Sequence, residues 1–404
     1  MDVQKHATHI VAKLVKAGYK AYFAGGWVRD YLMDHPSSDI DIATSAPPEK
    51  ILDLFPHTIL LGMAFGVVIV VIEGHQFEVS TFRRDLEYEG GRRPLGVEYS
   101  DDEEDALRRD FTINGMFYDP LEKKVIDYVG GAADIEKGLV RTIGVADERF
   151  VEDRLRMIRA IRFATRFGFR IDQETQDAIR ENADTLFPAV AIERVWSEFT
   201  KMAAYPNFDH AVIELHRLGL LQVVLPALTH VHLNEIKQRV AHFRYFPTGI
   251  SPIFYLLELF PEIKPADQDE LCKNLKVSNA TRNLAAYLYS LQIQLKGPED
   301  KVRLVHAFAH PANDICLKVI AAGMGQEREL FLEKQRHFRE DYQVYIDAIV
   351  QKSPLVQAKD LLQRGILPGR EMGFLLKEAE KIAILKKITN PQQILEILWS
   401  EKDD

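Results

Sequence analysis

Two aspartates separated by one isoleucine are the first residues in the chain whose type and spacing could support catalysis. Asp39, Ile40, Asp41 and Ile42 alternate acidic and apolar side chains, as a strand with one buried face does. On such a strand both carboxylates point the same way, and adjacent carboxylates suit Mg²⁺ together with water and substrate phosphates. Paired ions could activate an attacking hydroxyl and neutralise the charge on a leaving pyrophosphate. A solvent-facing acidic strand edge has the same pattern, so the pair alone does not establish a metal site.

A pair of glycines lies shortly before the aspartates. Gly25 and Gly26 fall between a β-prone run that ends at Phe23 and a helical stretch that begins at Trp27. Glycines at such a turn let the backbone approach a phosphate, and the first turn of a helix offers unpaired N–H groups to an anion. Arg29, one turn into that helix, could add a charged contact to a triphosphate. Together, in this order, the glycine turn and the acidic pair indicate a phosphate-handling site more specifically than either does alone.

The elements that must position these residues follow from the hydrophobic periodicity. Residues 1–139 mix β-prone runs with helical stretches, and the N-terminus predicts an amphipathic helix rather than a signal peptide. The polar segment 84–105, which ends in a run of acids, predicts a mobile loop. After residue 148 helical periodicity continues to the C-terminus, which predicts an α/β head followed by roughly three helical subdomains. The predicted strands cover residues 19–23, 38–43, 66–73, 76–82, 124–128 and 140–143, and the predicted head helices cover 27–33 and 47–55.

Five segments occur in the order of a known family signature. In them the chain resembles the polymerase-β-like nucleotidyltransferases and, more narrowly, the bacterial-type (class II) tRNA nucleotidyltransferase (CCA-adding enzyme) and poly(A) polymerase family. The strong matches cover about the first 200 residues, and beyond them only GILPG at 365–369 is similar to a tail-domain segment. The matching segments are GGWVRD at 25–30, DIDIAT at 39–44, FEVSTFR at 77–83, RRDFTIN at 108–114, and EDRLR at 152–156, which runs into RAIRFA at 159–164.

The resemblance implies a catalytic set of three carboxylates. Asp39 and Asp41 would hold two Mg²⁺ ions, and Glu78 would supply a third carboxylate from an adjoining strand. An exposed strand residue without a catalytic role is the alternative for Glu78.

The segment around Asp110 matches the part of the family linked to recognition of the ribose. An Asp can accept hydrogen bonds from the sugar hydroxyls, and Arg109 could hold that carboxylate or a phosphate. Asn114, about a helical turn later, could assist, and a capping or packing role is the alternative.

Asp153 and Arg156 are the residues that the resemblance links to the choice of nucleotide. On a helix they would be i, i+3 neighbours that orient each other. Cytosine and adenine both place an amino donor beside a ring acceptor, so an Asp acceptor with an Arg donor fits both bases and rejects guanine and uracil. A surface ion pair without a substrate role is the alternative. Arg159 and Arg162 are further candidates for nucleotide binding, within a run that could grip phosphate and base: Arg149, Arg154, Arg156, Arg159, Arg162, Arg166 and Arg170.

A flexible-loop motif bears on the length of the added tail. Tyr88, Arg92, Arg93 and Pro94 are similar to the flexible loop of full CCA-adding enzymes, although Gly90 stands where many members carry an acid. Enzymes that add only two cytidines typically lack this motif, so its presence favours addition of the terminal adenosine.

The segment after Gly62 bears on the poly(A) alternative. Poly(A) polymerases of the family usually carry a basic pair after a Leu-Leu-Gly segment, whereas Leu60-Leu61-Gly62 is followed by Met63 and Ala64. That absence argues against poly(A) polymerase.

The resemblance further implies an elongated molecule with an α/β head and all-α neck, body and tail domains. We place the nucleotidyltransferase head at residues 1–139, the nucleotide-selecting neck at 140–203, the body at 204–300 and the tail at 301–404. The tail helices would hold the tRNA elbow or acceptor arm.

The composition is that of an ordinary soluble protein. The chain has 404 residues, of which 47% are hydrophobic and 27% charged, and no segment is apolar and long enough to span a bilayer. Cys272 and Cys316 lie in apolar contexts and are expected to be buried thiols, which favours a reducing cytoplasm. The net charge of −9 argues only weakly against RNA, because local charge decides nucleic-acid binding.

The leading hypothesis is template-independent addition of CCA to the 3′ end of tRNA from CTP and ATP. Poly(A) polymerase and a partial enzyme that adds only CC or only A are the alternatives within the family. An inactive RNA-binding module is disfavoured by the intact pair Asp39 and Asp41, and a phosphohydrolase is disfavoured because the chain has no adjacent His-Asp pair. The sequence does not determine the oligomeric state.

Overall fold

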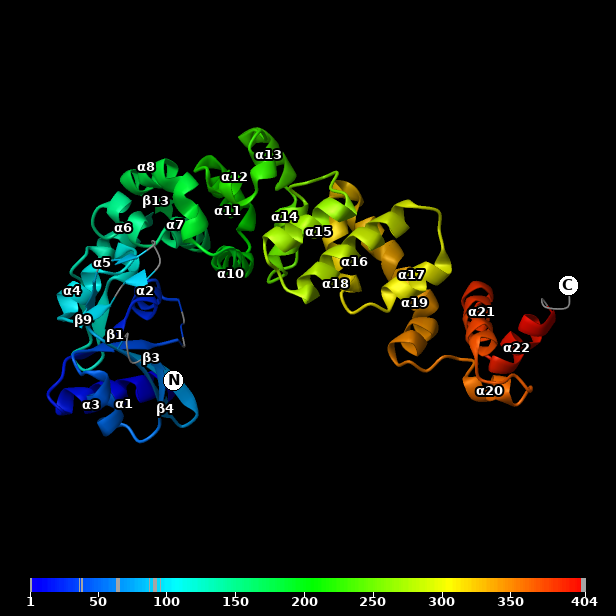
Figure 1. Cartoon of the computed structure of the whole chain (residues 1–404), viewed down its shortest axis with the longest axis horizontal. Coiled ribbons are helices and arrows are strands. Elements are labelled where there is room, and N and C mark those ends of the chain that lie inside the picture. The colour runs from blue at the N-terminus through cyan, green and yellow to red at the C-terminus, as the bar shows by residue number, and fades with distance from the viewer. Residues whose placement is uncertain are drawn as a thin grey trace. The chain divides into compact units, whose positions relative to one another are not determined.

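The computed structural model describes residues 2–400 except 36, 38, 63–65, 87, 90–92 and 95. The chain forms two compact units, Met1–Gln238 and Arg239–Asp404. The first unit contains an α/β head and the helices that follow it, and the described part of the second unit contains helices and connecting segments (Figure 1). The predicted succession of an α/β head and helical domains is therefore confirmed, whereas the finer division at residues 139, 203 and 300 stays a prediction.

The head is built on a seven-stranded mixed sheet with the strand order β11-β10-β1-β2-β5-β4-β3. β2 and β5 run parallel, with Ile42 opposite Val79, and the other neighbouring strands run antiparallel. β4 and β5 form the hairpin that the sequence predicted. The strands of this sheet are β1 (Ala21–Ala24), β2 (Asp41–Thr44), β3 (Thr58–Gly62), β4 (Val67–Ile72), β5 (His75–Thr81), β10 (Phe117–Asp119) and β11 (Lys124–Ile126).

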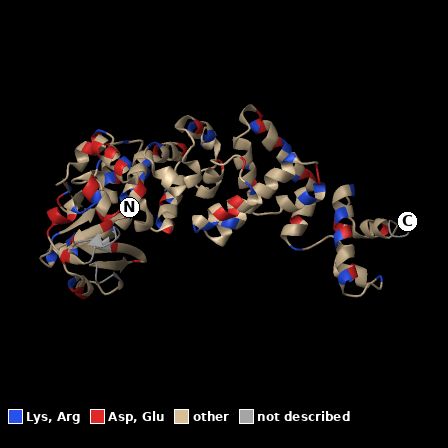
Figure 2. Cartoon of the chain, turned by 45° about the horizontal axis from the view of Figure 1, so that its top comes forward, with Lys and Arg blue, Asp and Glu red and all other residues tan. Residues whose placement is uncertain are grey.

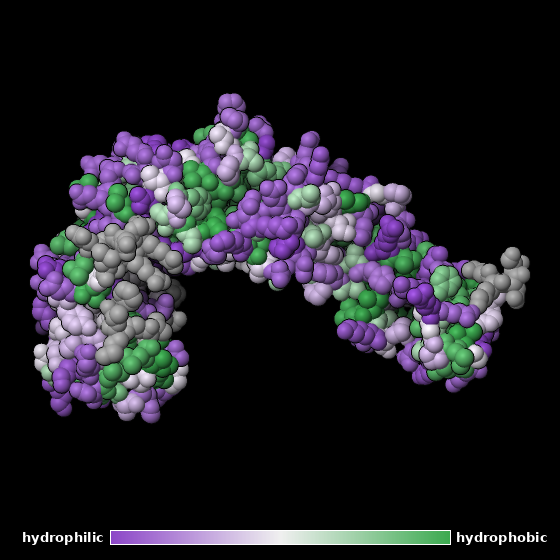
Figure 3. Space-filling view, viewed as in Figure 1, coloured by the Kyte–Doolittle hydropathy of each residue, from purple (hydrophilic) through white to green (hydrophobic). Residues whose placement is uncertain are grey.

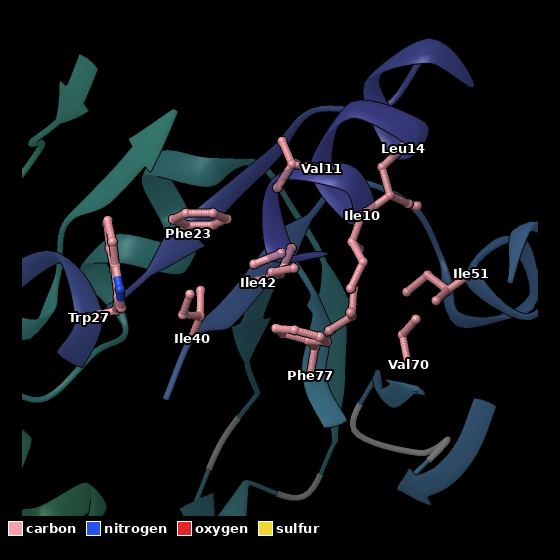
Figure 4. Close-up of a cluster of buried hydrophobic side chains, with 14 of the residues drawn as sticks. Ile10, Val11, Leu14, Phe23, Trp27, Ile40, Ile42, Ile51, Val70 and Phe77 are labelled. Carbon is pink, nitrogen blue, oxygen red and sulfur yellow. The ribbon is translucent and has the colours of Figure 1, made fainter. Parts of the chain in front are cut away.

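One face of this sheet packs against α1 (Asp2–Lys16) and α3 (Pro48–Leu54), because every second strand residue turns toward those helices. Figure 4 shows Ile10 of α1 beside Ile42 and Phe77 of the sheet, and all three are at most 1% exposed. The opposite face carries a smaller apolar cluster and also the polar side chains of Asp41 and Glu78. That smaller cluster consists of Ala24, Ala43, Phe82, Ala106 and Phe117.

Further helices, some between the strands in sequence and most after them, complete the first unit. α7 packs against α10 and α11, and α10 buries Val195, Phe199 and Met202 at helical spacing on one side. β12 (Leu139–Val140) overlaps the strand predicted at 140–143, and it pairs in parallel with β13 (Arg170–Ile171), which lies where only helices were expected after residue 148. The helices are α2 (Gly26–Leu32), α4 (Asp102–Leu107), α5 (Gly131–Glu136), α6 (Ala146–Glu152), α7 (Leu155–Phe167), α8 (Gln173–Asn182), α9 (Leu186–Ala189), α10 (Ile192–Ala203), α11 (Phe208–Arg217), α12 (Leu220–Val224) and α13 (Leu233–Arg239).

The second unit is a succession of packed helices, and both cysteines are buried within it as free thiols, as predicted. Burial raises the pKa of Cys316 to about 12. Figure 3 shows a mostly hydrophilic surface with scattered apolar patches, and no helix in the described residues is long and apolar enough to cross a bilayer. The helices are α14 (Pro252–Leu257), α15 (Pro265–Asn274), α16 (Asn279–Lys296), α17 (Lys301–Phe308), α18 (Asn313–Ala322), α19 (Arg328–Val350), α20 (Ala358–Leu362), α21 (Arg370–Lys386) and α22 (Pro391–Ser400).

The segment 84–105 differs from its prediction as a loop. β6 (Arg83–Asp85) pairs with β9 (Val97–Tyr99), and β7 (Tyr88–Glu89) pairs with β8 (Arg93–Pro94). The run of acids begins α4, where the side chain of Asp101 accepts a hydrogen bond from the Glu104 N–H. Acids favour the first turn of a helix, which explains why a polar run folded into one.

Candidate active site

The two aspartates lie at the open end of β2. Ile40 and Ile42 are buried, at 4% and 0% exposure, whereas Asp39 and Asp41 are exposed, so the predicted alternation is confirmed although the strand itself begins at Asp41. Glu78 lies on β5. Because β2 and β5 are parallel with Ile42 opposite Val79, Asp41 and Glu78 each precede that pair and share one face of the sheet.

The carboxylate of Asp41 lies in a region of strong negative charge. The protein around it displaces water although the side chain stays accessible, and Glu78 and then Asp39 add repulsion. These effects raise the pKa of Asp41 to about 6, and the nearby guanidinium of Arg109 only partly offsets them. A cation bound beside these carboxylates would therefore stabilise the site.

A metal site made by the protein alone is not present among the described residues, because no three Asp, Glu, His or Cys side chains are grouped to bind an ion. Mg²⁺ is usually held by one or two carboxylates and completed by water and substrate phosphates. The open carboxylates of Asp39 and Asp41, just before and at the start of β2, fit that second mode, in which substrate phosphates supply the remaining oxygens.

The glycine turn has the geometry that a close approach requires. Gly25 has φ of +62°, a region that favours glycine, and a Cβ built there would lie 2.9 Å from Arg109 Nη1. Its N–H donates to the Met116 carbonyl at 3.1 Å, which ties the turn to β10. Ala24 pairs with Asp41 across β1 and β2, so the turn and the acidic pair lie at the same end of the sheet.

A chain of hydrogen bonds joins the helix after this turn to the segment 108–114. Arg29, only 4% exposed, bonds to Asp30 and donates from Nη1 to Asn114 Oδ1. Asn114 Nδ2 donates to Asp110 Oδ1 at 3.1 Å, and Arg159 Nε donates to Asp110 Oδ2 at 2.8 Å. Burial alone would raise the pKa of Asp110, but the charge of Arg159 and the hydrogen bonds lower it to about 2. Asp110 is therefore a fixed, ionised acceptor.

Asp105 is a supporting residue that the sequence analysis did not single out. Its carboxylate is 1% exposed and accepts hydrogen bonds from both Arg108 and Arg109, at 2.6 and 2.9 Å for the Nη2 atoms. Arg109 also lies over the Phe117 ring, 4.9 Å from its centroid. An acid followed at i+3 and i+4 by two arginines is the pattern that could have revealed this anchor.

Asp153 and Arg156 line the same cleft as Asp110, but they are not neighbours on one helix. The chain leaves helical geometry at Asp153, which has φ of −145° and separates α6 from α7, so the predicted i, i+3 arrangement on a continuous helix is wrong. Asp153 pairs with Arg194 of α10 at 2.8 Å, and Arg156 pairs with Glu152. Arg156 also donates to the Arg149 carbonyl at 3.0 Å.

These residues surround one cleft in the first unit. Its volume is about 390 Å³, and Phe163, Arg108 and Asp85 line it in addition to predicted residues. The spacing of motifs could not show Asp85, because it lies in the segment predicted as a loop. The lining residues are Gly25, Gly26, Arg29, Asp41, Asp85, Arg108, Arg109, Asp110, Asn114, Asp153, Arg156, Arg159 and Phe163.

Some predicted site residues lie elsewhere. Arg162 is buried behind the cleft, bonded to Glu198 at 2.5 Å and stacked on Phe163, so it supports the wall from behind. Arg92 lies outside the described residues, and of Arg93 only the backbone, in β8, is described. Asp39 and Glu78 flank Asp41 without lining the cleft.

The arginine run after residue 148 is largely neutralised within the protein. Figure 2 shows basic and acidic residues interleaved over the first unit. Arg149 pairs with Glu152, Arg159 with Asp110, and Arg162 with Glu198. Much of the run therefore organises the cleft, and a basic RNA-gripping surface made from it stays a prediction.

Three family models match the chain in succession. A poly(A) polymerase head domain matches residues 21–141, a probable RNA- and SrmB-binding site of polymerase A matches 168–231, and a tRNA nucleotidyltransferase domain 2 matches 251–398. The cleft is formed by the first of these regions and by residues 153–163, at the start of α7 and along it.

Curated relatives and a solved structure extend the likeness over the whole chain. A CCA-adding enzyme of Ligilactobacillus salivarius is 32% identical over 398 residues, which are 98% of this chain and 95% of that protein. A CCA-adding enzyme of Geobacillus thermodenitrificans is 43% identical over 242 residues, 60% of this chain and 59% of that protein's length. The crystal structure of the Bacillus stearothermophilus CCA-adding enzyme in complex with CTP superposes with a TM-score of 0.82 and 28% identity, covering 100% of this chain and 98% of that one.

Proposed function

Because this chain belongs to the family of CCA-adding enzymes, we propose that it adds CCA to the 3′ end of tRNA from CTP and ATP without a template. The observation that carries the proposal is the single cleft of about 390 Å³ in which the glycine turn, Asp41, Asp110 and the pair Asp153 and Arg156 meet. Each group would have its own partner in the reacting complex. The glycine turn would face the phosphates, Asp41 the metal, Asp110 the ribose, and Asp153 and Arg156 the base. The likeness to an enzyme crystallised with CTP supports the same substrate class.

Asp39 and Asp41 would hold the divalent metal, two Mg²⁺ ions in our proposal, with Glu78 beside them. The open carboxylates and the raised pKa of Asp41 fit that role, because a cation relieves the repulsion among them. When bound, the ions would polarise the attacking 3′-hydroxyl and neutralise charge on the departing pyrophosphate.

The protein's own groups position the nucleotide. Gly25 and Gly26 let the triphosphate approach the backbone, and Arg109 adds a guanidinium beside them. Asp110 would accept from the ribose hydroxyls, and because Asn114 and Arg159 fix its carboxylate, it needs no reorganisation to do so.

Asp153 and Arg156 would select the base by its pairing edge. Asp153 would accept from the exocyclic amino group of cytosine or adenine, and Arg156 would donate to the adjacent ring nitrogen. Guanine and uracil present the opposite pattern, and each mismatched buried group costs about 1–3 kcal/mol. Side chains thereby replace a template strand.

The remaining parts follow from the same proposal. The neck, in which Arg162 lies behind the cleft, would carry base selection, and the body and tail would hold the tRNA. A protein with this substrate would work in the cytoplasm, where tRNA is matured.

The test is extension of a tRNA that ends at the discriminator base, with all four nucleotides and Mg²⁺ present, followed by sequencing of the products. We expect tails that stop at CCA. Three outcomes would overturn the full CCA assignment in favour of the partial or poly(A) alternatives. These are products that end at CC, a long A tail, and failure to extend this tRNA although an A is added to a tRNA that already ends in CC.

A further inference from the structure

The carboxylate of Asp153 is held by an arginine from another helix. Arg194, in the first turn of α10, donates from Nη2 to Asp153 Oδ2 at 2.8 Å and from Nη1 to Oδ1 at 3.3 Å. The Leu155 N–H donates to the same Oδ1 at 3.1 Å. Both side chains are partly accessible, at 27% for Arg194 and 19% for Asp153. The pair therefore lies at the wall of the cleft rather than in the core.

This arrangement sets the direction of the acceptor. Asp153 has extended backbone geometry between α6 and α7, so no helix restrains its side chain. A two-pronged guanidinium fixes the plane of a carboxylate, which a single hydrogen bond does not. An ionised carboxylate has about four acceptor positions, so Asp153 retains acceptor capacity toward the cleft after these three bonds.

The helix that carries Arg194 is itself anchored. Glu198, one turn further along α10, is 2% exposed and accepts from Arg162 of α7 at 2.5 Å. Lys201 donates to the other Glu198 oxygen at 2.9 Å. α10 is thus tied to α7 beneath the cleft, and its position transmits to Asp153 through Arg194.

We propose that Arg194 is a positioning residue for nucleotide selection: it aims the carboxylate of Asp153 at the pairing edge of the incoming base. The inference rests on the proposed function, since it takes Asp153 as the acceptor for the base. Arg194 is not among the residues that line the cleft, so in this proposal it acts through Asp153 rather than by contacting the nucleotide.

The test compares selectivity in the full-length protein. For Arg194→Ala and Arg194→Lys, kcat/KM is measured for CTP against UTP on tRNA ending at the discriminator base, and for ATP against GTP on tRNA ending in CC. We expect Arg194→Ala to lower both ratios about tenfold, the effect of one misplaced hydrogen-bonding group. Arg194→Lys, which keeps the charge but not the fork, should restore part of the loss.

A matched control separates selectivity from stability. Arg217 is an arginine of the first unit with similar exposure, 31%, that joins α11 to Gln176 of α8 at 2.7 Å and pairs with Glu214 away from the cleft. Arg217→Ala should lower the melting temperature without changing either ratio. Equal losses of kcat/KM for all four nucleotides in Arg194→Ala would show a merely structural role and overturn the proposal.

A double-mutant cycle tests the route through Asp153. If Arg194 acts through Asp153, then Asp153→Ala with Arg194→Ala should be no less selective than Asp153→Ala alone, whereas additive losses would contradict the proposal. The two levels of inference fail differently. Unchanged selectivity in Asp153→Ala would remove the proposed role of Asp153 itself, and lost selectivity in Asp153→Ala but not in Arg194→Ala would remove only the role of Arg194.

Discussion

Two charged regions border the same cleft, and they are built in opposite ways. On the sheet, Asp39, Asp41 and Glu78 lie together, and in the part of the chain that the structure describes none of them forms an ion pair. In the second region, which is bordered by α7 and α10, carboxylates are matched to guanidiniums, as Asp110 is to Arg159 and Asp153 to Arg194. The pKa of Asp41 is raised to about 6 while that of Asp110 is lowered to about 2.

The difference indicates which kind of ligand each region is suited to bind. Uncompensated carboxylates are unfavourable until a cation arrives, so the sheet side is suited to ions that enter with the nucleotide. Compensated carboxylates are already oriented, so the second region is suited to reading hydrogen-bonding groups without rearrangement. One region supplies charge chemistry and the other supplies geometry.

The largest effect should come from removing a charge on the sheet side. Asp41→Asn should abolish Mg²⁺-dependent extension, because one of two proposed ligands is lost, while tRNA binding in a gel-shift assay stays intact. Since the native carboxylate is repelled by its neighbours, the melting temperature should stay the same or rise. The control Asp53→Asn, at an exposed position on α3, should be active. Persistent extension by Asp41→Asn would contradict the assignment of the site.

Neutralising a paired carboxylate of the second region should instead destabilise the fold. Asp110→Asn leaves Arg159 without its anion and should cost about 3 kcal/mol of unfolding free energy, the lower end for a buried pair because the Arg159 side chain is 30% exposed. KM for nucleotides should rise as well, because the proposed ribose acceptor is lost. Urea unfolding and steady-state kinetics measure the two effects, and an unaltered unfolding free energy would refute the contrast between the regions.

A glycine comparison probes the turn that both regions face. Gly25→Ala adds a side chain at φ of +62° and within 2.9 Å of Arg109 Nη1, so kcat/KM should fall about tenfold through strain of about 1–3 kcal/mol. Gly74→Ala has a similar strain, at φ of +83°, but no neighbour within 4 Å. We expect it to lower stability and leave the nucleotide KM unchanged, and equal KM values for the two variants would argue against a phosphate site at Gly25.

The smallest effect is the dependence of stability on pH. The folded-state pKa of Asp110, about 2, lies below its ordinary value of 3.8, so the stabilisation is fully present well above pH 4 and is lost as the pH falls from there toward 2. The difference in melting temperature between the native protein and Asp110→Asn should therefore shrink over that window. A constant difference down to pH 2 would show that Asp110 does not carry its charge as described.

Local sequence patterns predicted much of the secondary structure of the head. The alternation at 39–42 placed two isoleucines in the core and two aspartates on the other face, because strand geometry sends alternate residues to opposite sides. The hairpin of β4 and β5 followed from a turn between two apolar runs. β3 and β10 were missed, since each is defined by its neighbours in the sheet rather than by its own periodicity.

The sequence by itself determined which residues could do chemistry, because residue types and their order are local properties of the chain. Only the tertiary structure decided which of these side chains pair with one another. Asp153 pairs with Arg194, 41 residues away, rather than with Arg156, and Asp110 pairs with Arg159, 49 residues away. Such pairs depend on how α7 and α10 pack beside the sheet, and packing of separate elements leaves no periodic trace in the sequence.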